Sequence, residues 1–299
     1  MPGARSAVDR QLPILEEIFL DHLAHFVPDP QAASRALARA GFAPTPISIQ
    51  VVPDSDGTLR PTGTGNVTAM FSRGYIEMLF KTADTPLGRE LEAALARHDG
   101  VHLVAFAVAD ATAAHRRLAA AGFRVQPVVH MQRPVDTGGA PGIAAFTLAR
   151  LEPGQMPEGR IQILTHRTEA MVWQPRWLSH PNGAVALTSV IIAVGDLNDA
   201  AQRFARFTGR EAAPSPLGQT IELDRGRVQL LTPEAFARKL PDVPIPSLPF
   251  IGAYGIRVAS LAVTLDLLKR AGLRTRRGEQ ELVAIFPEEL GRGAWLFAE

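Results

Sequence analysis

The sequence predicts an α+β fold built from four copies of one β-α-β-β-β unit, joined as two pairs. Three observations support this prediction. One segment recurs four times in the 299 residues, each copy carries the start and stop signals of a single helix, and alternating apolar and polar residues follow each helix. With 46% hydrophobic residues, the chain is long and apolar enough for about two ordinary domains with a full core.

The repeat is visible in the letters of the sequence. The segment LDHLAHFVPDPQAASRALARAGFAPTP, from Leu20, matches VHLVAFAVADATAAHRRLAAAGFRVQP, from Val101. A third copy, VIIAVGDLNDAAQRFARFTGREAAP, begins at Val190, and a fourth, GIRVASLAVTLDLLKRAGLRTRR, begins at Gly255. Such self-similarity predicts that one supersecondary unit is used four times.

Each copy predicts one strand followed by one helix. A short apolar run rich in Val, Ile and Phe leads to an Asp or Ser that can accept a hydrogen bond from the first helical turn. A large apolar residue then lies on the buried stripe, and a glycine stands where a left-handed C-cap belongs. In copy order, the N-caps are Asp29, Asp110, Asp196 and Ser260, the apolar residues are Leu37, Leu118, Phe204 and Leu268, and the glycines are Gly41, Gly122, Gly209 and Gly272.

Further strands are expected after each helix, because alternating stretches are separated there by turn residues. If Arg73-Gly74 is a two-residue hairpin turn, Glu77 lies across from Met70. The expected strands are Ile47 to Val52, Asn66 to Ser72 and Tyr75 to Phe80 in the first copy, and Gln219 to Asp224 and Arg227 to Leu231, around Arg225-Gly226, in the third.

The predicted domain organisation follows from these copies. Between the second and third copies, two prolines and Asn182-Gly183 interrupt regular structure, and Trp173 and Trp177 indicate that this connector packs against the body. The predicted parts are an extension (1–18), a first domain (19–166, with modules 19–90 and 100–166), a packed connector (167–184) and a second domain (185–299, with modules 185–235 and 250–299).

Composition excludes several classes of function. Lys+Arg 31 against Asp+Glu 30 gives a net charge of +1, so no global field attracts nucleic acid. The absence of cysteine excludes disulfides, thiolate nucleophiles and cysteine-bound metals. The longest apolar stretch, Ala184 to Val194, is too short to span a membrane. A cytoplasmic small-molecule protein without nucleic acid or membrane partners is therefore expected, and a homodimer stays open.

Four short segments carry a resemblance to a known superfamily: Leu20-Asp21-His22, Gly63-Thr64-Gly65-Asn66, Gly74-Tyr75-Ile76-Glu77 and His180-Pro181-Asn182-Gly183-Ala184. With the paired units, they resemble the vicinal oxygen chelate superfamily of glyoxalase I, bleomycin- and fosfomycin-resistance proteins and extradiol dioxygenases, and most of all its glyoxalase-like domain proteins. The resemblance covers nearly the whole chain. It implies two cup-shaped mixed β-sheet domains, each of two paired modules, with helices on the outside.

The same resemblance implies a metal site on the first and last strands of each unit. Its positions in the first pair carry His22, Glu77 and Gln162, a set that suits a divalent ion such as Zn, Ni, Mn or Fe. Leu103 stands at the fourth position, and strand alternation turns His102 to the opposite face. No nucleotide cofactor is expected, because Gly63-Thr64-Gly65-Asn66 lacks the Lys-Ser/Thr ending of a phosphate loop.

The pocket residues are expected on the face that His22 shares with the small Ala24. Alternation puts Leu103 and Ala105 on the matching face of the second copy. Asn66, Thr68 and Met70 share the face of Glu77 and are the remaining substrate-binding candidates: the full set is Asn66, Thr68, Met70, Leu103 and Ala105. The corresponding positions of the second pair are Ser189, Gln229, Ala253 and Trp295 or Leu296, which make no metal set and predict a scaffold or a second, metal-free pocket.

Two functions remain open at this level. One is a metal-dependent enzyme of lyase, isomerase or dioxygenase type that acts on a small organic substrate with vicinal oxygens, with Glu77 as the catalytic residue that exchanges a proton. The alternative is a non-catalytic protein that binds or sequesters a small molecule through a degenerate metal site. His166 and His180 flank the connector; they could reach the first cup, but they are expected to cap the connector's own backbone.

Overall fold

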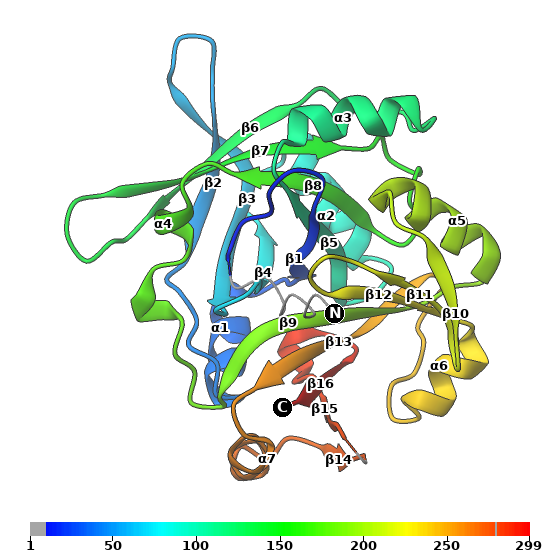
Figure 1. Cartoon of the computed structure of the whole chain (residues 1–299). Helices are drawn as coiled ribbons and strands as arrows, with labels where there is room; N and C mark the ends of the chain where they lie inside the picture. Colours follow the sequence, from blue (N-terminus) through cyan, green and yellow to red (C-terminus); the bar gives the residue numbers. More distant parts are fainter. Residues whose placement is uncertain (1–9, 279) are drawn as a thin grey trace, which may run out of the picture.

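The computed structural model describes residues 10–278 and 280–299, and it mixes strands and helices in the predicted order (Figure 1). The α+β class is therefore confirmed. The first pair of units consists of β1 (Ile18–Phe26), α1 (Pro30–Arg39), β2 (Ser48–Pro53), β3 (Leu59–Met70), β4 (Tyr75–Lys81), α2 (Pro86–Leu95), β5 (Gly100–Val108), α3 (Ala111–Ala120), β6 (Val129–Val135), β7 (Gly142–Arg150) and β8 (Arg160–His166).

The second pair follows a short connector and repeats this plan with shorter strands. The connector holds α4 (Glu169–Val172) and η1 (Pro175–Trp177). The second pair consists of β9 (Ala184–Ala193), α5 (Leu197–Thr208), β10 (Ala212–Ser215), β11 (Gly218–Glu222), β12 (Arg227–Leu231), α6 (Pro233–Lys239), β13 (Phe250–Val258), α7 (Leu261–Arg270), β14 (Thr275–Arg277), β15 (Leu282–Ile285), η2 (Glu288–Leu290) and β16 (Ala294–Ala298). No helix in the described part of the chain is both long and apolar enough to cross a membrane.

The strands of the first pair close on themselves. Their order is β1-β4-β3-β2-β6-β7-β8-β5, and β1 also pairs with β5, so the sheet forms a ring around an interior. The second pair is open, in the order β10-β11-β12-β9-β13-β16-β15-β14. The first pair can therefore enclose a site, whereas the second presents one open face.

The predicted caps explain where the four repeated helices begin and end. The Asp29 carboxylate accepts hydrogen bonds from the backbone N–H groups of Gln31 and Ala32, Asp110 accepts two in the same way, and Asp196 and Ser260 each accept one from the residue three positions on. The glycine after each helix has a positive φ, for example 78° at Gly41 and 69° at Gly209. Both predictions are confirmed.

The predicted turn between β3 and β4 is wrong by two residues. Thr68, not Met70, lies opposite Glu77, and Met70 lies opposite Tyr75. The connection runs from Phe71 to Gly74, because β9 holds its tip: Arg73 donates to the Val185 carbonyl and accepts from the Leu187 N–H. A shift of two keeps every side chain on its face.

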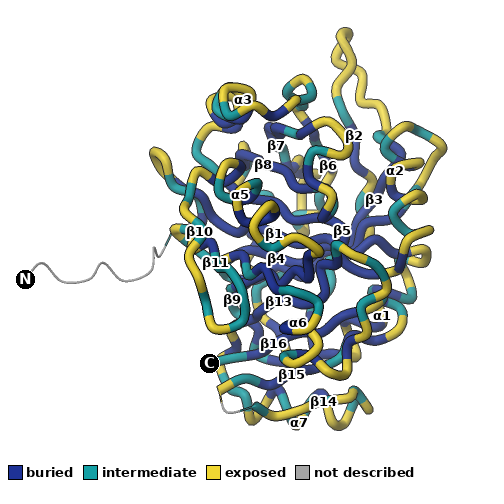
Figure 2. The backbone as a smooth tube through the Cα atoms, turned by 90° about the vertical axis from the view of Figure 1, so that its right-hand side faces the viewer, coloured by how far each residue is buried: buried dark blue, intermediate teal, exposed yellow. Residues whose placement is uncertain are grey.

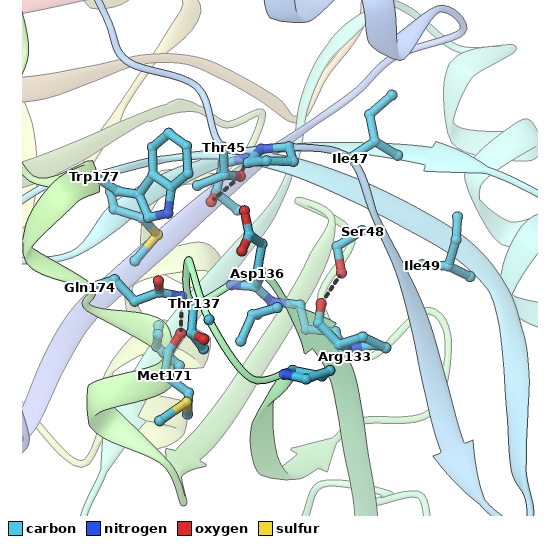
Figure 3. A pocket seen from close by; sticks show the side chains of 18 residues that line it. Thr45, Ile47, Ser48, Ile49, Arg133, Asp136, Thr137, Met171, Gln174 and Trp177 are labelled. Atoms are coloured by element: carbon cyan, nitrogen blue, oxygen red, sulfur yellow. Dashed lines mark hydrogen bonds between the residues drawn. The ribbon is translucent and has the colours of Figure 1, made fainter.

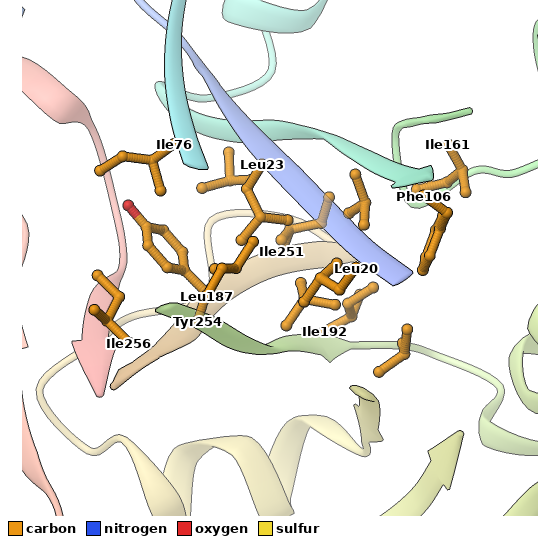
Figure 4. Packing of buried hydrophobic residues seen from close by; sticks show 14 of the residues in the cluster. Leu20, Leu23, Ile76, Phe106, Ile161, Leu187, Ile192, Ile251, Tyr254 and Ile256 are labelled. Carbon is orange, nitrogen blue, oxygen red and sulfur yellow. The ribbon is translucent and has the colours of Figure 1, made fainter. Parts of the chain in front are cut away.

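The two pairs are joined by a shared core between their central strands. Figure 4 shows Leu20 and Leu23 of β1 packed against Ile192 of β9 and Tyr254 of β13. Leu37 of α1 and Leu118 of α3 belong to the same cluster. The bulky face of the first strands therefore lies against the second pair as well as under helices, and Figure 2 shows these strands buried.

In the second pair, side chains fill the face that corresponds to a cup. Phe236 and Leu240, from α6 and its C-terminus, pack with Ile191, Ala253 and Leu296. Trp295 points to the other face, where its indole N–H donates to the Tyr254 hydroxyl. This packing fits a scaffold role, and a pocket of about 290 Å³ beside Val283 and Ile285 keeps the alternative of a second, metal-free pocket open.

Candidate functional site

The candidate site is a cavity of about 30 Å³ inside the ring of the first pair. It has room for an ion or a water molecule. Five of the predicted site residues line it: His22, Asn66, Glu77, Leu103 and Gln162. They come from β1, β3, β4, β5 and β8, so the closure of the ring brings them together.

The other predicted residues lie elsewhere. Thr68 and Met70 line a larger pocket of about 490 Å³. Ala105 is fully buried in the apolar cluster that also holds Leu103, and it lines neither cavity. The prediction that Ala105 contacts a ligand stays a prediction.

His22 and Glu77 face each other across the cavity. The His22 Nε2 atom lies 3.7 Å from Glu77 Oε2, which is too far for a hydrogen bond. The His22 Nδ1–H donates to Asp21 at 2.7 Å, and in the tautomer that this bond selects, Nε2 presents its lone pair to the carboxylate. Two buried acceptors that face each other favour a cation or a proton between them.

Asp21 is the second partner of His22 and is itself fixed from the other side. Its Oδ1 accepts from His166 Nε2–H at 2.9 Å, and Asp21 is fully buried. Burial raises the pKa of Asp21, but the charge and hydrogen bonds of His166 and His22 outweigh it and hold this pKa well below its ordinary value. The expectation that His166 caps the connector is therefore wrong.

His180 also differs from its expected role. Its Nε2–H donates to the Met70 carbonyl at 2.8 Å, and its Nδ1 accepts from the Ala43 N–H at 2.9 Å. These partners belong to the first unit rather than to the connector. His180 therefore ties the end of the connector to the first pair and lies outside the cavity lining.

Amide side chains hold the second oxygen of Glu77. Asn66 Nδ2 donates to Glu77 Oε1 at 2.5 Å, and Gln50 Nε2 donates to the same atom at 3.2 Å. Thr64 in turn donates to Gln50 Oε1. Asn66 Oδ1 is buried without a hydrogen-bond partner among the described residues. These contacts fix one carboxylate oxygen and leave Oε2 directed toward His22.

Tyr75 covers one side of the His22 ring. The two rings are stacked with centroids 4.4 Å apart, and Trp173 packs edge-on against Tyr75. Burial, together with the charges of Asp21 and Glu77, raises the pKa of Tyr75 well above its ordinary value. The phenol therefore stays neutral beside His22 and restricts the ring's rotation.

Three arginines line the opposite wall. Arg150 Nε donates to Gln162 Oε1 at 3.0 Å, and Arg160 Nε donates to Glu90 at 2.9 Å. Burial, with the charge of Arg160, lowers the pKa of Arg150 to about 10. Arg133, on β6, is the third. Sequence reasoning missed all three. A signal existed for Arg133, because Met131 and Arg133 alternate with more exposed residues in β6 and so share its inner face.

The fourth predicted ligand position offers no donor. Leu103 points into the cavity, while His102 Nε2–H donates to the His98 carbonyl at 2.7 Å on the other face. Burial lowers the pKa of His102 to about 3. Strand alternation thus excludes His102 from the site.

The donors that are present suit a divalent ion only if amide or substrate oxygens take part. Among the described residues, no three His, Cys, Asp or Glu side chains gather as a metal site. Ligands of one ion, each about 2.0–2.2 Å from it, lie about 3–4 Å apart, and His22 Nε2 and Glu77 Oε2 meet this spacing. The free Asn66 Oδ1 and the Gln162 amide add oxygen donors at the same cavity.

The larger pocket lies beside the cavity, and Arg133 lines both. It is bounded by the strand β2, the loop after β6 and the connector. In Figure 3, Trp177 and Met171 lie on one side of this pocket, and Ile47 and Ile49 lie on the opposite side. The pocket can therefore take an apolar group whose polar end reaches Arg133.

Paired β-α-β-β-β units that close around a single cavity define a protein of the vicinal oxygen chelate fold. A family model described as a glyoxalase-like domain matches residues 20–208, and the chain belongs to this family. No curated protein matches the chain.

Solved structures share this fold at low sequence identity. A hypothetical protein from Staphylococcus aureus has a TM-score of 0.63 at 10% identity, covering 94% of this chain and 98% of its own. A mutant 4-hydroxymandelate synthase from Streptomyces coelicolor has a TM-score of 0.56 at 15% identity, covering 95% and 94%. A Mn(II)-bound glyoxalase from Novosphingobium aromaticivorans has a TM-score of 0.54 at 13% identity, covering 95% and 81%.

Proposed function

We propose that the first pair is the active site of a metal-dependent enzyme that acts on a small organic substrate with vicinal oxygens. The observation that carries this proposal is the pair of acceptors, His22 Nε2 and Glu77 Oε2, which face each other 3.7 Å apart. The Mn(II)-bound glyoxalase, which shares the fold, supports the same reading. A bound divalent ion would act as a Lewis acid toward the substrate oxygens.

The side chains of this chain prepare the site for proton transfer. Asp21 holds the His22 ring through Nδ1, as carboxylates do behind metal-binding histidines. Asn66 and Gln50 hold Glu77 Oε1 and leave Oε2 to hold the ion; once released from the ion by the substrate, Oε2 would accept a proton from the substrate carbon and return it. Arg150, whose Nε binds Gln162 Oε1, orients that amide. Proton transfer of this kind favours lyase or isomerase chemistry over dioxygenase chemistry.

A second candidate is a protein that binds a small molecule without converting it. Leu103 in place of a fourth ligand and the pocket of about 490 Å³ favour this alternative. It predicts that an organic compound stabilises the protein equally with and without metal. The enzyme proposal predicts that metal changes this stabilisation, because the substrate oxygens would then bind the ion.

The deciding experiment is elemental analysis of protein purified without chelator. We expect roughly one divalent ion per chain in the wild type and its loss in both His22→Ala and Glu77→Ala. Matched controls are His115→Ala, on the outer helix α3, and Glu92→Ala, at an exposed position of α2. Unchanged metal content in both cavity variants would exclude the metal site and leave the binding protein.

A further inference from the structure

Arg133 lies at the junction of the two cavities. Arg133 is 6% exposed, and it lines both the inner cavity and the larger pocket. β6 places it there because Met131 and Arg133 are the buried residues of an otherwise partly exposed strand. The guanidinium is therefore aimed inward by strand alternation.

Arg133 differs from its two cationic neighbours in having no partner. Arg150 donates to Gln162, and Arg160 donates to Glu90. Among residues 10–278 and 280–299, the Arg133 side chain makes no hydrogen bond and no ion pair within 4 Å, although the charge of Glu77 acts on it at longer range. A buried guanidinium with five unused donors is costly for a folded protein.

An anion would remove this cost. A guanidinium binds a carboxylate through two parallel hydrogen bonds, which is the planar geometry that Arg favours. Glu77 carries the opposite charge nearby, so the site favours a single negative charge over a phosphate dianion. The larger pocket adjoining Arg133 exposes apolar side chains, among them Ile47, Ile49, Met171 and Trp177.

We propose that Arg133 is a substrate-binding residue that holds the carboxylate of a monoanionic substrate, whose apolar body occupies the larger pocket. This inference rests on the proposed function, since it names the substrate class for the same site. The carboxylate on Arg133 would direct the neighbouring oxygenated carbon toward His22 and Glu77, because Arg133 lines their cavity as well.

The test measures binding in the absence of metal, so that its outcome is independent of the metal site. Wild-type protein in EDTA is titrated by calorimetry with 3-phenylpropanoate, with its neutral analogue 3-phenylpropanamide, and with benzylphosphonate. We expect the carboxylate to bind most tightly. Arg133→Gln should weaken its binding about tenfold or more, and Arg124→Gln, at an exposed surface ion pair with Glu152, should leave it unchanged.

Several results would overturn the proposal. Among them are equal binding of the acid and the amide, wild-type affinity for the acid in Arg133→Gln, and absence of binding by the acid at millimolar concentration. Tighter binding of benzylphosphonate than of the acid would assign the site to a phosphate-like dianion and also overturn it. Acid binding that depends on Arg133, together with a metal content that stays at the wild-type level in His22→Ala and Glu77→Ala, would reject the metal proposal alone.

The Tm of an Arg133 variant provides a second test, because losing Arg133 should weaken ligand binding but stabilise the ligand-free protein. If Arg133 serves a ligand, Arg133→Met removes an unpaired buried charge, and the Tm of the ligand-free protein should rise by about 2–4 °C. The same variant should lose the Tm increase that 3-phenylpropanoate gives the wild type. A lower Tm of Arg133→Met without ligand would show that Arg133 supports the fold instead.

Discussion

Glu77 and Gln162 occupy equivalent positions of the two units that form the ring. In the parallel pairing of β1 with β4, Glu77 lies beside Ala24, and in the pairing of β5 with β8, Gln162 lies beside Ala105. Both side chains line the inner cavity. The repeat therefore places two oxygen-bearing side chains at one site, but gives them different charge.

Gln162→Glu should strengthen the binding of a divalent ion, because it adds a second carboxylate at the equivalent position. We expect the dissociation constant for Mn²⁺, measured by calorimetry, to fall about tenfold. Gln219→Glu, on β11 of the second pair, is the control and should leave it unchanged. Weaker Mn²⁺ binding in Gln162→Glu would mean that Arg150 neutralises the new carboxylate.

Asp21→Asn should weaken metal binding although Asp21 does not line the cavity. Asp21 binds His22 through one carboxylate oxygen and His166 through the other. The neutral amide of the variant has a single oxygen and cannot accept from both rings, so the His22 ring loses its orientation. Metal affinity should fall about 10–100-fold, while Asp266→Asn, at an exposed position of α7, should have no effect. Wild-type affinity in Asp21→Asn would show that Tyr75 alone orients the ring.

Stability should fall as the pH decreases from about 6.5 to 4, because of buried His25. Its Nδ1–H donates to the Leu290 carbonyl, and its Nε2 accepts from the Tyr254 hydroxyl. Burial lowers the pKa of His25 from 6.5 to about 4. Below pH 6.5 the unfolded chain therefore binds a proton that the folded protein excludes, so the free energy of unfolding decreases.

The loss attributable to His25 is about 3 kcal/mol between these two pH values. Urea unfolding at pH 7 and pH 4 measures it. His25→Gln should show a smaller pH dependence than the wild type, although buried His102, with a pKa of about 3, keeps part of it. If the free energy of unfolding of His25→Gln changed with pH as much as that of the wild type, the pH dependence would not come from His25.

Gly74→Ala should destabilise the protein more than Gly122→Ala. Both glycines have positive φ, 74° and 85°, and both substitutions therefore carry the backbone cost of about 1 kcal/mol. A Cβ at Gly74 would lie 2.7 Å from the Asp21 carbonyl oxygen, whereas nothing lies within 4 Å at Gly122. We expect an additional loss of about 1–3 kcal/mol in Gly74→Ala, measured by urea unfolding. Equal losses would show that β1 yields without cost.

Phe236→Ala should destabilise the chain without changing its metal content. Phe236 is fully buried in the apolar cluster of the second pair, and removing its ring should lower the free energy of unfolding by about 3–5 kcal/mol. Elemental analysis of the folded variant should match the wild type. Loss of metal in this variant would place function in the second pair and contradict its role as a scaffold.

Local patterns in the sequence are sufficient for the architecture. The N-cap and glycine of each copy act within a few residues, so they predict the four repeated helices directly. Strand alternation is also local, and it correctly places His22 with Leu103 and turns His102 away. The hairpin register after Arg73 was wrong because its tip is held by β9, more than a hundred positions along the chain.

The chemistry of the site depends on contacts that no local pattern contains. Asp21 meets His166 across 145 positions, Gln50 reaches Glu77 from another strand, and Arg133 enters the cavity only because the ring closes through β2 and β6. Alternation predicts which face a side chain takes, but the strand order decides which faces meet. The sequence therefore specified the repeated units and the His22–Glu77 face, and the closed ring decided which charges surround that face.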